Sequence, residues 1–345
     1  MSLEVGRDRL VFRWRGAKYE WTIEPRYWRN PLIYVGCLII VTIAMYFVRP
    51  SILPTLISAN LLAAIALPLS WMTIGTGRIN LGPQLFVGVG GYIAALLSVN
   101  YGFSAAQTFP IVLLGSLAVG FIISPLTTVA RGLYFCLLTL IIPLIFMELT
   151  FIFGGLFHGD IGISGIAPLV STANPLLSYL IAAFASLIMM LIYLYIVDKV
   201  TRSRIGLIMG AINDDEDVAN MMGVNINRIK ILSFAIPACL IGIVGWFYAH
   251  YYCTFAGVTY LPLTFMIKIL LVLIVGGRTQ IYGCVIAAYF ISFLEVALTS
   301  LVGMLSPLTF PIILLILICA LPEGLYGIYR KSHYRDYLPT VHMRR

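Results

Sequence analysis

The sequence predicts an all-α fold, a polytopic bundle of about ten membrane-spanning helices. Of its 345 residues, 61% are hydrophobic and 10% are charged, and the mean hydropathy is +0.98; soluble domains are about 45–50% apolar and about 25% charged. Residues 79–130 form a run of 52 without a charged side chain. Because one membrane crossing takes about 20 apolar residues, this run holds at least two crossings. The surplus of apolar residues and the scarcity of charges exclude a soluble enzyme. The apolar residues run continuously rather than alternating, which excludes a β-barrel.

Charge and hydropathy divide the chain into three parts. Residues 1–30 are a basic N-terminal tail, residues 31–327 a transmembrane domain, and residues 328–345 a basic C-terminal tail. The apolar runs place ten predicted spans at 31–48, 52–72, 84–99, 109–129, 133–153, 176–197, 231–251, 263–275, 281–301 and 307–321. The eighth and tenth are shorter than the roughly 20 residues of a full crossing, so each is expected to be tilted, broken or only partly membrane-crossing.

Basic residues decide the predicted orientation. With both termini in the cytoplasm, all of the 22 Lys and Arg residues lie on the cytoplasmic side except Arg49 and Lys268. Membrane proteins carry an excess of Lys and Arg in their cytoplasmic loops. We therefore expect a multi-pass protein of the cell (inner) membrane, with a loop over 198–230 inside and a loop over 154–175 outside. This topology explains the net charge of +8, so we expect the protein to contact membrane lipid and not to bind nucleic acid.

The hydrophilic segments carry no pattern typical of an enzyme. The sequence has no Gly-x4-Gly-Lys-Ser/Thr phosphate loop, and no nucleophile–base or paired-carboxylate motif. The six cysteines are far apart and mostly within apolar runs, and His158 and Asp160 are too few for a metal site. The sequence thus predicts no catalytic residue, no metal site, no cofactor bound by this chain and no ATPase site of its own.

The inner loop contains a run of four acidic residues at 214–217. Asn213 or Asp214 is a plausible N-cap, since acidic side chains are favoured in the first turn of a helix. Met221 and Met222 end the predicted short helix, and Gly223 is a natural residue just past its C-terminus. Such a helix suits docking in a groove of another protein, and a solvated connector fits these residues equally well.

The outer loop is rich in glycine, with five glycines among residues 154–168. Glycine permits positive φ angles and leaves backbone N–H groups accessible. The loop could bind the carboxylate of a small zwitterion or dock a delivery protein, and its candidate residues are Asp160, Ser164 and Gly165. The alternative is a compact turn between two helices.

Residues 75–92 hold the densest glycine cluster of the membrane region. Gly and Pro near an apolar run allow broken helices, where transporters place substrates, or close helix packing, and both interpretations stay open. Three charges lie within spans, Glu148, Lys268 and Glu295, where a charge is costly and usually paired or functional. They could form a structural salt bridge or a proton or ion relay. The candidate residues for a translocation pathway are Asn80, Gly82, Gln84, Gly88 and Glu148.

The inner loop resembles the cytoplasmic loop of ABC-importer permeases, whose motif is Glu-Ala-Ala, three residues, Gly, and later Ile-x-Leu-Pro. Here Asp217, Val218 and Ala219 precede Gly223 by the same three residues, and Phe-Ala-Ile-Pro follows at 234–237. The stretches 131–135 (Arg-Gly-Leu-Tyr-Phe), 159–166 (Gly-Asp-Ile-Gly-Ile-Ser-Gly-Ile) and 322–327 (Pro-Glu-Gly-Leu-Tyr-Gly) are similar to the LivM-type permeases of branched-chain amino acid importers. The similarity extends from about residue 52 to 327.

The resemblance implies an ABC-importer permease fold and a subunit that forms half of a translocation pathway. Its partners would be a sister permease in a heterodimer, two cytoplasmic ATPase subunits that use ATP, and an extracytoplasmic substrate-binding protein. Closure of the ATPases would move a coupling helix near 214–222 and reorient the spans. The implied coupling residues are Asp214, Asp215, Glu216, Asp217, Ala219, Met221, Met222 and Gly223.

The implied substrates are branched-chain or related small amino acids. Closely similar permeases carry urea, short amides or aromatic acids, so these substrates remain alternatives. Arg78 and Pro83 interrupt a stretch that the family usually fills with Gly-Gln-Leu-Ser-Leu-Gly-His, which leaves the substrate range open. The alternative of another class is a secondary transporter driven by an ion through the three intramembrane charges.

Overall fold

The computed structural model describes residues 2–5, 9–14, 17–22, 52–130, 132–171, 174–221, 223, 225–277 and 281–303. Contacts divide the chain into two units, residues 1–50 and residues 51–345. The predicted first span at 31–48, the predicted tenth span at 307–321 and the predicted C-terminal tail lie outside the described residues.

The N-terminal unit contains a three-stranded antiparallel sheet. Its strands are β1 (Ser2–Val5), β2 (Arg9–Trp14) and β3 (Ala17–Thr22), in the order β1-β2-β3. The register of β2 and β3 runs from Arg9 paired with Thr22 to Trp14 paired with Ala17. The all-α prediction is therefore incomplete, because it treated this segment only as a basic tail.

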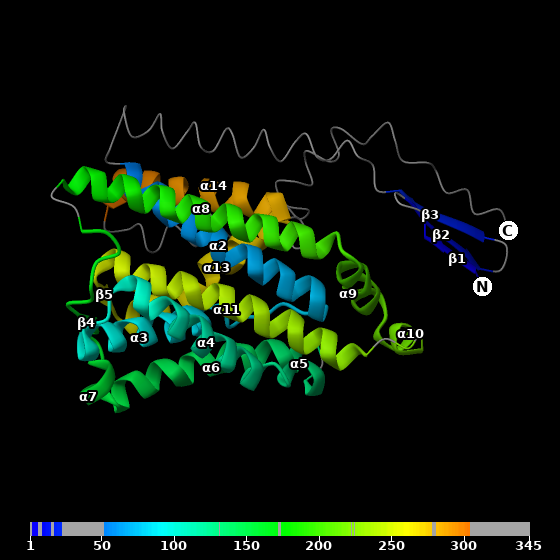
Figure 1. Ribbon diagram of the computed structural model, residues 1–345, viewed down its shortest axis with the longest axis horizontal. Helices are drawn as coiled ribbons and strands as arrows, with labels where there is room; N and C mark the ends of the chain where they lie inside the picture. The colour runs from blue at the N-terminus through cyan, green and yellow to red at the C-terminus, as the bar shows by residue number, and fades with distance from the viewer. Residues whose placement is uncertain are drawn as a thin grey trace. The chain divides into compact units, whose positions relative to one another are not determined.

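The second unit is a helical bundle with two short strands at one end (Figure 1). Its first half consists of α2 (Leu53–Thr76), α3 (Pro83–Tyr101), α4 (Ala105–Ile123), α5 (Leu126–Val129), α6 (Leu133–Ile152), α7 (Gly154–Phe157), β4 (Ile163–Ser164) and α8 (Pro175–Thr201). Its second half consists of α9 (Arg204–Asp214), α10 (Glu216–Met221), α11 (Ile226–Tyr252), β5 (Thr254–Phe255), α12 (Gly257–Tyr260), α13 (Leu263–Gly276) and α14 (Ile281–Val302).

Eight helical segments in the described residues are long and apolar enough to cross a membrane. Each coincides with one of the predicted spans from the second to the ninth, so these eight predictions are confirmed. The eighth predicted span, 263–275, is the continuous helix α13. The short helix α12 precedes it and ends at Tyr260, because the missing N–H of Pro262 interrupts the helical hydrogen bonds. The apolar segment therefore runs from Gly257 to Gly276 and is longer than predicted.

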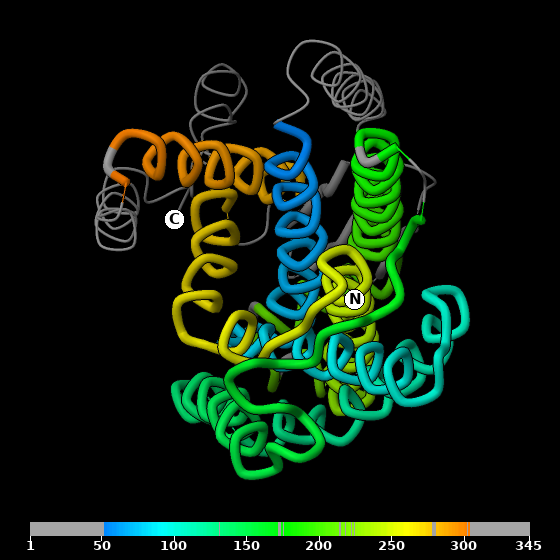
Figure 2. The backbone as a smooth tube through the Cα atoms, turned by 90° about the vertical axis from the view of Figure 1, so that its left-hand side faces the viewer, coloured from blue at the N-terminus to red at the C-terminus, as the bar shows by residue number. Residues whose placement is uncertain are grey.

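Helix α2 lies at the centre of the bundle, and 83% of its most apolar window is buried. Figure 2 shows it between α8 on one side and α13 and α14 on the other. Helix α11 packs against α2, α3 and α4. The interior is therefore built from α2, α3 and α11, which are the three most buried of the described spans.

Glycines allow α3 and α11 to approach with almost no side-chain layer between them. A Cβ atom on Gly90 would lie 1.9 Å from the carbonyl oxygen of Gly242, and one on Gly245 would lie 2.0 Å from that of Val87. Small residues permit such close crossings in membrane bundles. This part of the 75–92 glycine cluster thus serves close helix packing.

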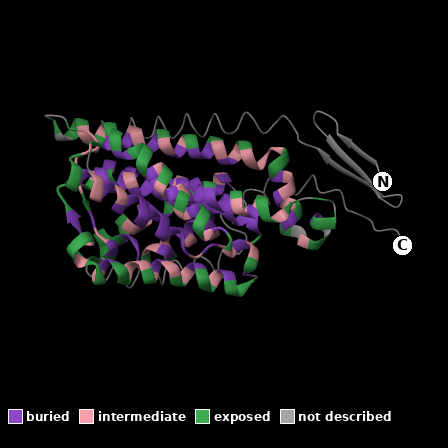
Figure 3. Cartoon of the chain, turned by 60° about the horizontal axis from the view of Figure 1, so that its bottom comes forward, coloured by how far each residue is buried: buried purple, intermediate pink, exposed green. Residues whose placement is uncertain are grey.

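The outer helices expose broad apolar faces. The most apolar windows of α4–α5 and α6 are only 22% buried, and Figure 3 shows exposed and partly exposed residues along the outer edge of the bundle. Leu114 is 64% exposed and Tyr134 is 75% exposed. Faces of this composition contact lipid or another protein chain.

Candidate functional site

The end of the bundle formed by α9 and α10, here called the α10 end, contains the acidic run 214–217. Helix α9 begins after Ser203, whose Oγ accepts the backbone N–H of Ile205 at 3.2 Å. It continues through Asn213 to Asp214, so neither residue is the N-cap of the next helix. That role belongs to Asp215, which is extended and accepts the backbone N–H of Asp217 at 2.9 Å. The predicted cap was wrong because α9 continues through the first acidic residue.

The predicted end of the short helix is confirmed. Helix α10 ends at Met221, and Gly223 has φ +82° and donates its N–H to the carbonyl oxygen of Asn220 at 2.9 Å. Asn225 then caps α11 by accepting the backbone N–H of Arg228 at 3.2 Å. Helix α10 is thus a six-residue element between two turns.

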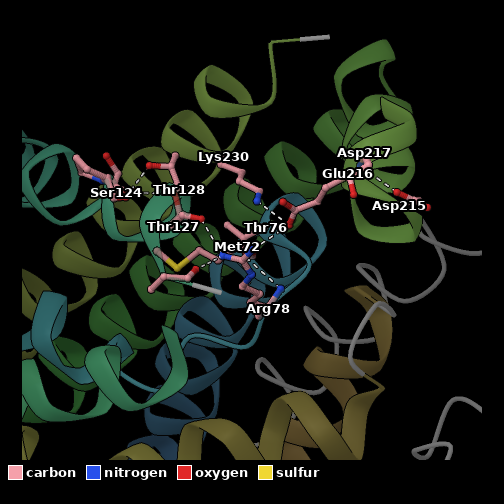
Figure 4. A network of polar contacts seen from close by, with 12 residues as sticks. Met72, Thr76, Arg78, Ser124, Thr127, Thr128, Asp215, Glu216, Asp217 and Lys230 are labelled. Atoms are coloured by element: carbon pink, nitrogen blue, oxygen red, sulfur yellow. Dashed lines mark hydrogen bonds and ion pairs between the residues drawn. The ribbon is translucent and has the colours of Figure 1, made fainter. Parts of the chain in front are cut away.

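The side chain of Glu216 points into the bundle end and joins two cations (Figure 4). Its Oε1 lies 2.9 Å from Nη2 of Arg78 and 2.6 Å from Nζ of Lys230. The side chain of Lys230 is 2% exposed and that of Arg78 11%. A carboxylate between two largely buried cations satisfies charges that would be costly to bury alone.

Arg78 extends this network to a third part of the bundle. Its Nη1 donates to the carbonyl oxygen of Thr127 at 2.9 Å and also to that of Ala130. Thr76 and the backbone of Arg78 bond each other in the turn after α2. The Arg78–Glu216–Lys230 network therefore connects α10 with the α2–α3 turn, with α5 and with α11.

A polar cavity of about 500 Å³ opens beside α10. Its lining comes from α5, from α10, from the turn that follows α10 and from the first turns of α11. The lining residues are Thr128, Glu216, Asp217, Asn220, Gly223, Asn225, Ile226, Asn227 and Lys230.

The coupling residues implied by the sequence differ in their exposure. Asp215 and Asp217 are exposed, and Met221 is 88% exposed. Ala219 is 2% exposed and faces inward. The side chain of Asp214 and residue Met222 lie outside the described part of the chain. The exposed acidic and methionine side chains leave one side of α10 available for contact.

The pathway candidates near the start of α3 lie in the packed interior. Asn80 is 1% exposed and its Oδ1 accepts the N–H of Gly82 at 2.8 Å. A Cβ on Gly82 would lie 2.1 Å from the carbonyl oxygen of Thr139, and one on Gly88 would lie 2.6 Å from the side chain of Leu261. Gln84 is fully buried, and neither of its amide atoms has a hydrogen-bond partner within the described residues.

The structure brings together two of the three intramembrane charges. Lys268 on α13 forms an ion pair with Glu295 on α14, which confirms the salt-bridge interpretation for these two residues. Glu148 lies on the exposed side of α6, close to Leu149 and Ile152. The three charges therefore do not form one cluster.

Residues 51–321 match a protein family described as the permease component of the branched-chain amino acid transport system. The chain belongs to this family of permeases. The match covers more than half of the chain and confirms the resemblance to LivM-type permeases. No curated protein and no solved structure matches the chain. The permease is thus a multi-pass membrane component of a branched-chain amino acid ABC transport system.

At the end opposite α10, here called the β4 end, the glycine-rich loop of the permease is folded against α3 and α11. Ile163 and Ser164 pair with Phe255 and Thr254 in an antiparallel ladder. The N–H of Ala167 donates to Oγ of Ser98 at 2.8 Å, and its carbonyl lies 2.7 Å from Nδ1 of His250. The loop is a defined structure fastened to two interior helices.

Positive φ angles shape this loop, as its glycines predicted. His158, Gly159, Gly162 and Gly165 have φ of 58°, 50°, 70° and 82°. The candidate residues Asp160, Ser164 and Gly165 are exposed. They form an outward surface of the permease at the β4 end.

Sequence reasoning missed Arg78 and Lys230 as parts of the α10 site. Lys230 was counted only as a basic residue near a membrane boundary, and Arg78 was noted besides only as a departure from the family's pattern. The only signal available for Lys230 was its place at the boundary of an apolar span, where a buried cation would need a carboxylate partner. The nearest acidic run along the permease is 214–217.

Proposed function

We propose that this permease forms half of the translocation pathway of an ATP-driven importer for branched-chain or related small amino acids, and that α10 docks on a separate ATPase subunit. The observation that carries the proposal is α10 itself, a six-residue helix at one end of the bundle that exposes Met221 while Glu216 ties it to the bundle end. The permease family, which takes part in ABC transport, supplies the kind of partner.

The exposed side of α10 has the chemistry of a docking surface. Asp215 and Asp217 lie at its N-terminus, where the helix dipole stabilises them, and remain exposed. Met221 adds a flexible apolar side chain that adapts to a groove. We expect the ATPase groove to present basic residues around an apolar floor.

The proposed orientation places the α10 end in the cytoplasm. Basic residues gather at that end on α8, α9 and α11, in agreement with the rule for cytoplasmic loops. The β4 end then faces the outside of the cell (inner) membrane. Its exposed Asp160, Ser164 and Gly165 are the proposed contacts for an extracytoplasmic substrate-binding protein.

The exposed position of Glu148 supports the proposal of a pathway at the boundary between this permease and a sister permease. A carboxylate within a span is too costly to leave facing lipid and normally faces water or a partner chain. Glu148 is exposed on α6, while the candidates Asn80 and Gln84 are buried inside the bundle. We therefore propose that the exposed face of α6 meets the sister permease, and that Glu148 lines the path between them.

Reconstitution tests the proposal. The permease, a sister permease, the ATPases and the binding protein are assembled in proteoliposomes, and uptake of radiolabelled leucine, valine, urea and benzoate is measured. We expect ATP-dependent leucine or valine uptake that disappears when any partner is omitted. Uptake by the permease alone, driven by an ion gradient, would contradict the proposal and favour a secondary transporter.

Two matched variants test the two ends separately. Asp217→Lys together with Met221→Glu should abolish co-purification of the ATPases and leave capture of the binding protein intact. Asp160→Lys should weaken capture of the binding protein and leave the ATPases bound. If both variants keep all partners, neither surface is an interface.

A further inference from the structure

Few contacts stabilise helix α10 in its position. Six residues are too short for a helix to be stable by itself. Of its described side chains, Ala219 is buried and the rest are exposed or partly exposed. Glu216 provides long-range polar links from this helix to the spans.

The two cations that meet Glu216 belong to parts of the chain far apart in sequence. Arg78 precedes Glu216 by 138 positions and lies in the turn between α2 and α3. Lys230 lies on α11, the helix that packs against α2, α3 and α4. One carboxylate oxygen thus links the turn between α2 and α3 to the N-terminal part of α11.

Because the members of the Arg78–Glu216–Lys230 network are charged, the network is intact only while α10 keeps its position against the bundle. If Glu216 moves away, the nearly buried Lys230 and Arg78 lose the carboxylate that offsets their positive charge, and removing one member of a buried ion pair is strongly unfavourable. Arg78 also holds α5 through the carbonyl oxygens of Thr127 and Ala130. A displacement of α10 must therefore shift these elements with it or break the network.

We infer that Glu216 is a positioning residue that transmits displacement of α10 to the α2–α3 turn, α5 and α11 through Arg78 and Lys230. The inference rests on the proposed function, in which α10 contacts an ATPase. It gives Glu216 a role different from that of the exposed Asp215 and Asp217. Those two face a partner, while Glu216 links α10 to the spans.

The experiment compares leucine transported per ATP hydrolysed in the reconstituted complex, using leucine-loaded binding protein as the probe. The variants are Glu216→Gln, Arg78→Gln and the double variant. The control is Asp198→Asn, which removes another carboxylate from an ion pair with an arginine. Asp198 on α8 pairs at 2.9 Å with Arg202, which follows the last residue of that helix, and accepts a hydrogen bond from Tyr282 on α14. Neither of these contacts involves α10.

Glu216→Gln should retain the bound ATPases within twofold and at least half of the ATP hydrolysis. Leucine transported per ATP should fall at least tenfold, whereas Asp198→Asn should lower it less than twofold. Arg78→Gln should cause a similar fall, and the double variant should be no worse than the poorer single variant, because the residues act through one network. Arg78→Gln also serves as the test if Glu216→Gln does not fold.

Two results would overturn the inference. One is a transport ratio for Glu216→Gln and Arg78→Gln equal to that of the control. The other is a loss of transport matched by an equal loss of bound ATPase, which would make Glu216 merely structural. In both cases the wild-type complex still transports leucine with ATP, whereas failure of the wild-type complex would instead refute the proposed function.

Discussion

The phenolic hydroxyl of Tyr92 on α3 accepts the backbone N–H of Gly257 at the start of α12, at 2.7 Å. Tyr92 is 2% exposed, and its ring meets those of Phe146, Phe157 and Phe255 edge-on. The contact joins residues 165 positions apart. It fixes α12, the short helix that precedes the eighth predicted span, against the bundle interior.

Tyr92→Phe should destabilise the permease. The change keeps the ring contacts but leaves the buried N–H of Gly257 without its acceptor, which costs about 1–3 kcal/mol. Thermal unfolding of the purified permease in detergent measures the effect. Tyr101→Phe is the control, since Tyr101 is 70% exposed, and equal melting temperatures for the two variants would contradict the role of this hydrogen bond.

Gly90→Ala should disrupt the crossing of α3 and α11. Its new Cβ would lie 1.9 Å from a backbone carbonyl oxygen, so the helices must separate. Overpacking of this kind costs about 1–3 kcal/mol. Gly210→Ala is the matched control, because a Cβ at that position would have no atom of the described residues within 4 Å and alanine is favoured over glycine in a helix by about 1 kcal/mol. Chemical unfolding should thus shift in opposite directions for the two variants.

The stability of the permease should depend on both members of the ion pair between Lys268 and Glu295. Lys268→Met leaves Glu295 alone in an apolar span and should lower stability by about 1–3 kcal/mol, less than for a fully buried pair because Glu295 is partly exposed. Lys268→Met combined with Glu295→Met should recover most of the loss. A double variant as unstable as the sum of the single variants would show that the two charges act independently.

Glu148→Cys should be labelled by a water-soluble, membrane-impermeant maleimide in the assembled importer, in a background without other cysteines. The expectation follows from the proposed path along α6, where position 148 faces water. Leu114→Cys is the control, because Leu114 is 64% exposed on the apolar face of α4 and should face lipid. If the maleimide fails to label position 148, or labels both positions equally, Glu148 lies outside a water-filled path.

The membrane helices were predictable because their signal is local. An apolar run of sufficient length needs no knowledge of its neighbours, and all eight described spans coincide with predicted ones. The sheet of β1, β2 and β3 was missed because the same residues were considered only for their charge. The prediction of a cap at Asn213 or Asp214 failed by one or two positions, since several neighbouring residues had equal capping ability.

The candidate site was only partly predictable because its key contacts join distant segments. The acidic run marked α10 correctly, and Gly223 marked the turn after it. Nothing local distinguishes Glu216, which binds two cations, from its neighbours Asp215 and Asp217. That difference arises from the packing of the α2–α3 turn and α11 beside α10, which periodicity alone does not reveal.

The glycine contacts between α3 and α11 have a mechanical consequence. Two helices whose backbones approach this closely at Gly90 and Gly245 leave no room for a side chain between them, so we expect α3 and α11 to move together as one rigid unit. In the proposed transport cycle, we expect movement at the boundaries of this unit with outer helices such as α6. The moving parts of the permease are then those least enclosed by its own chain.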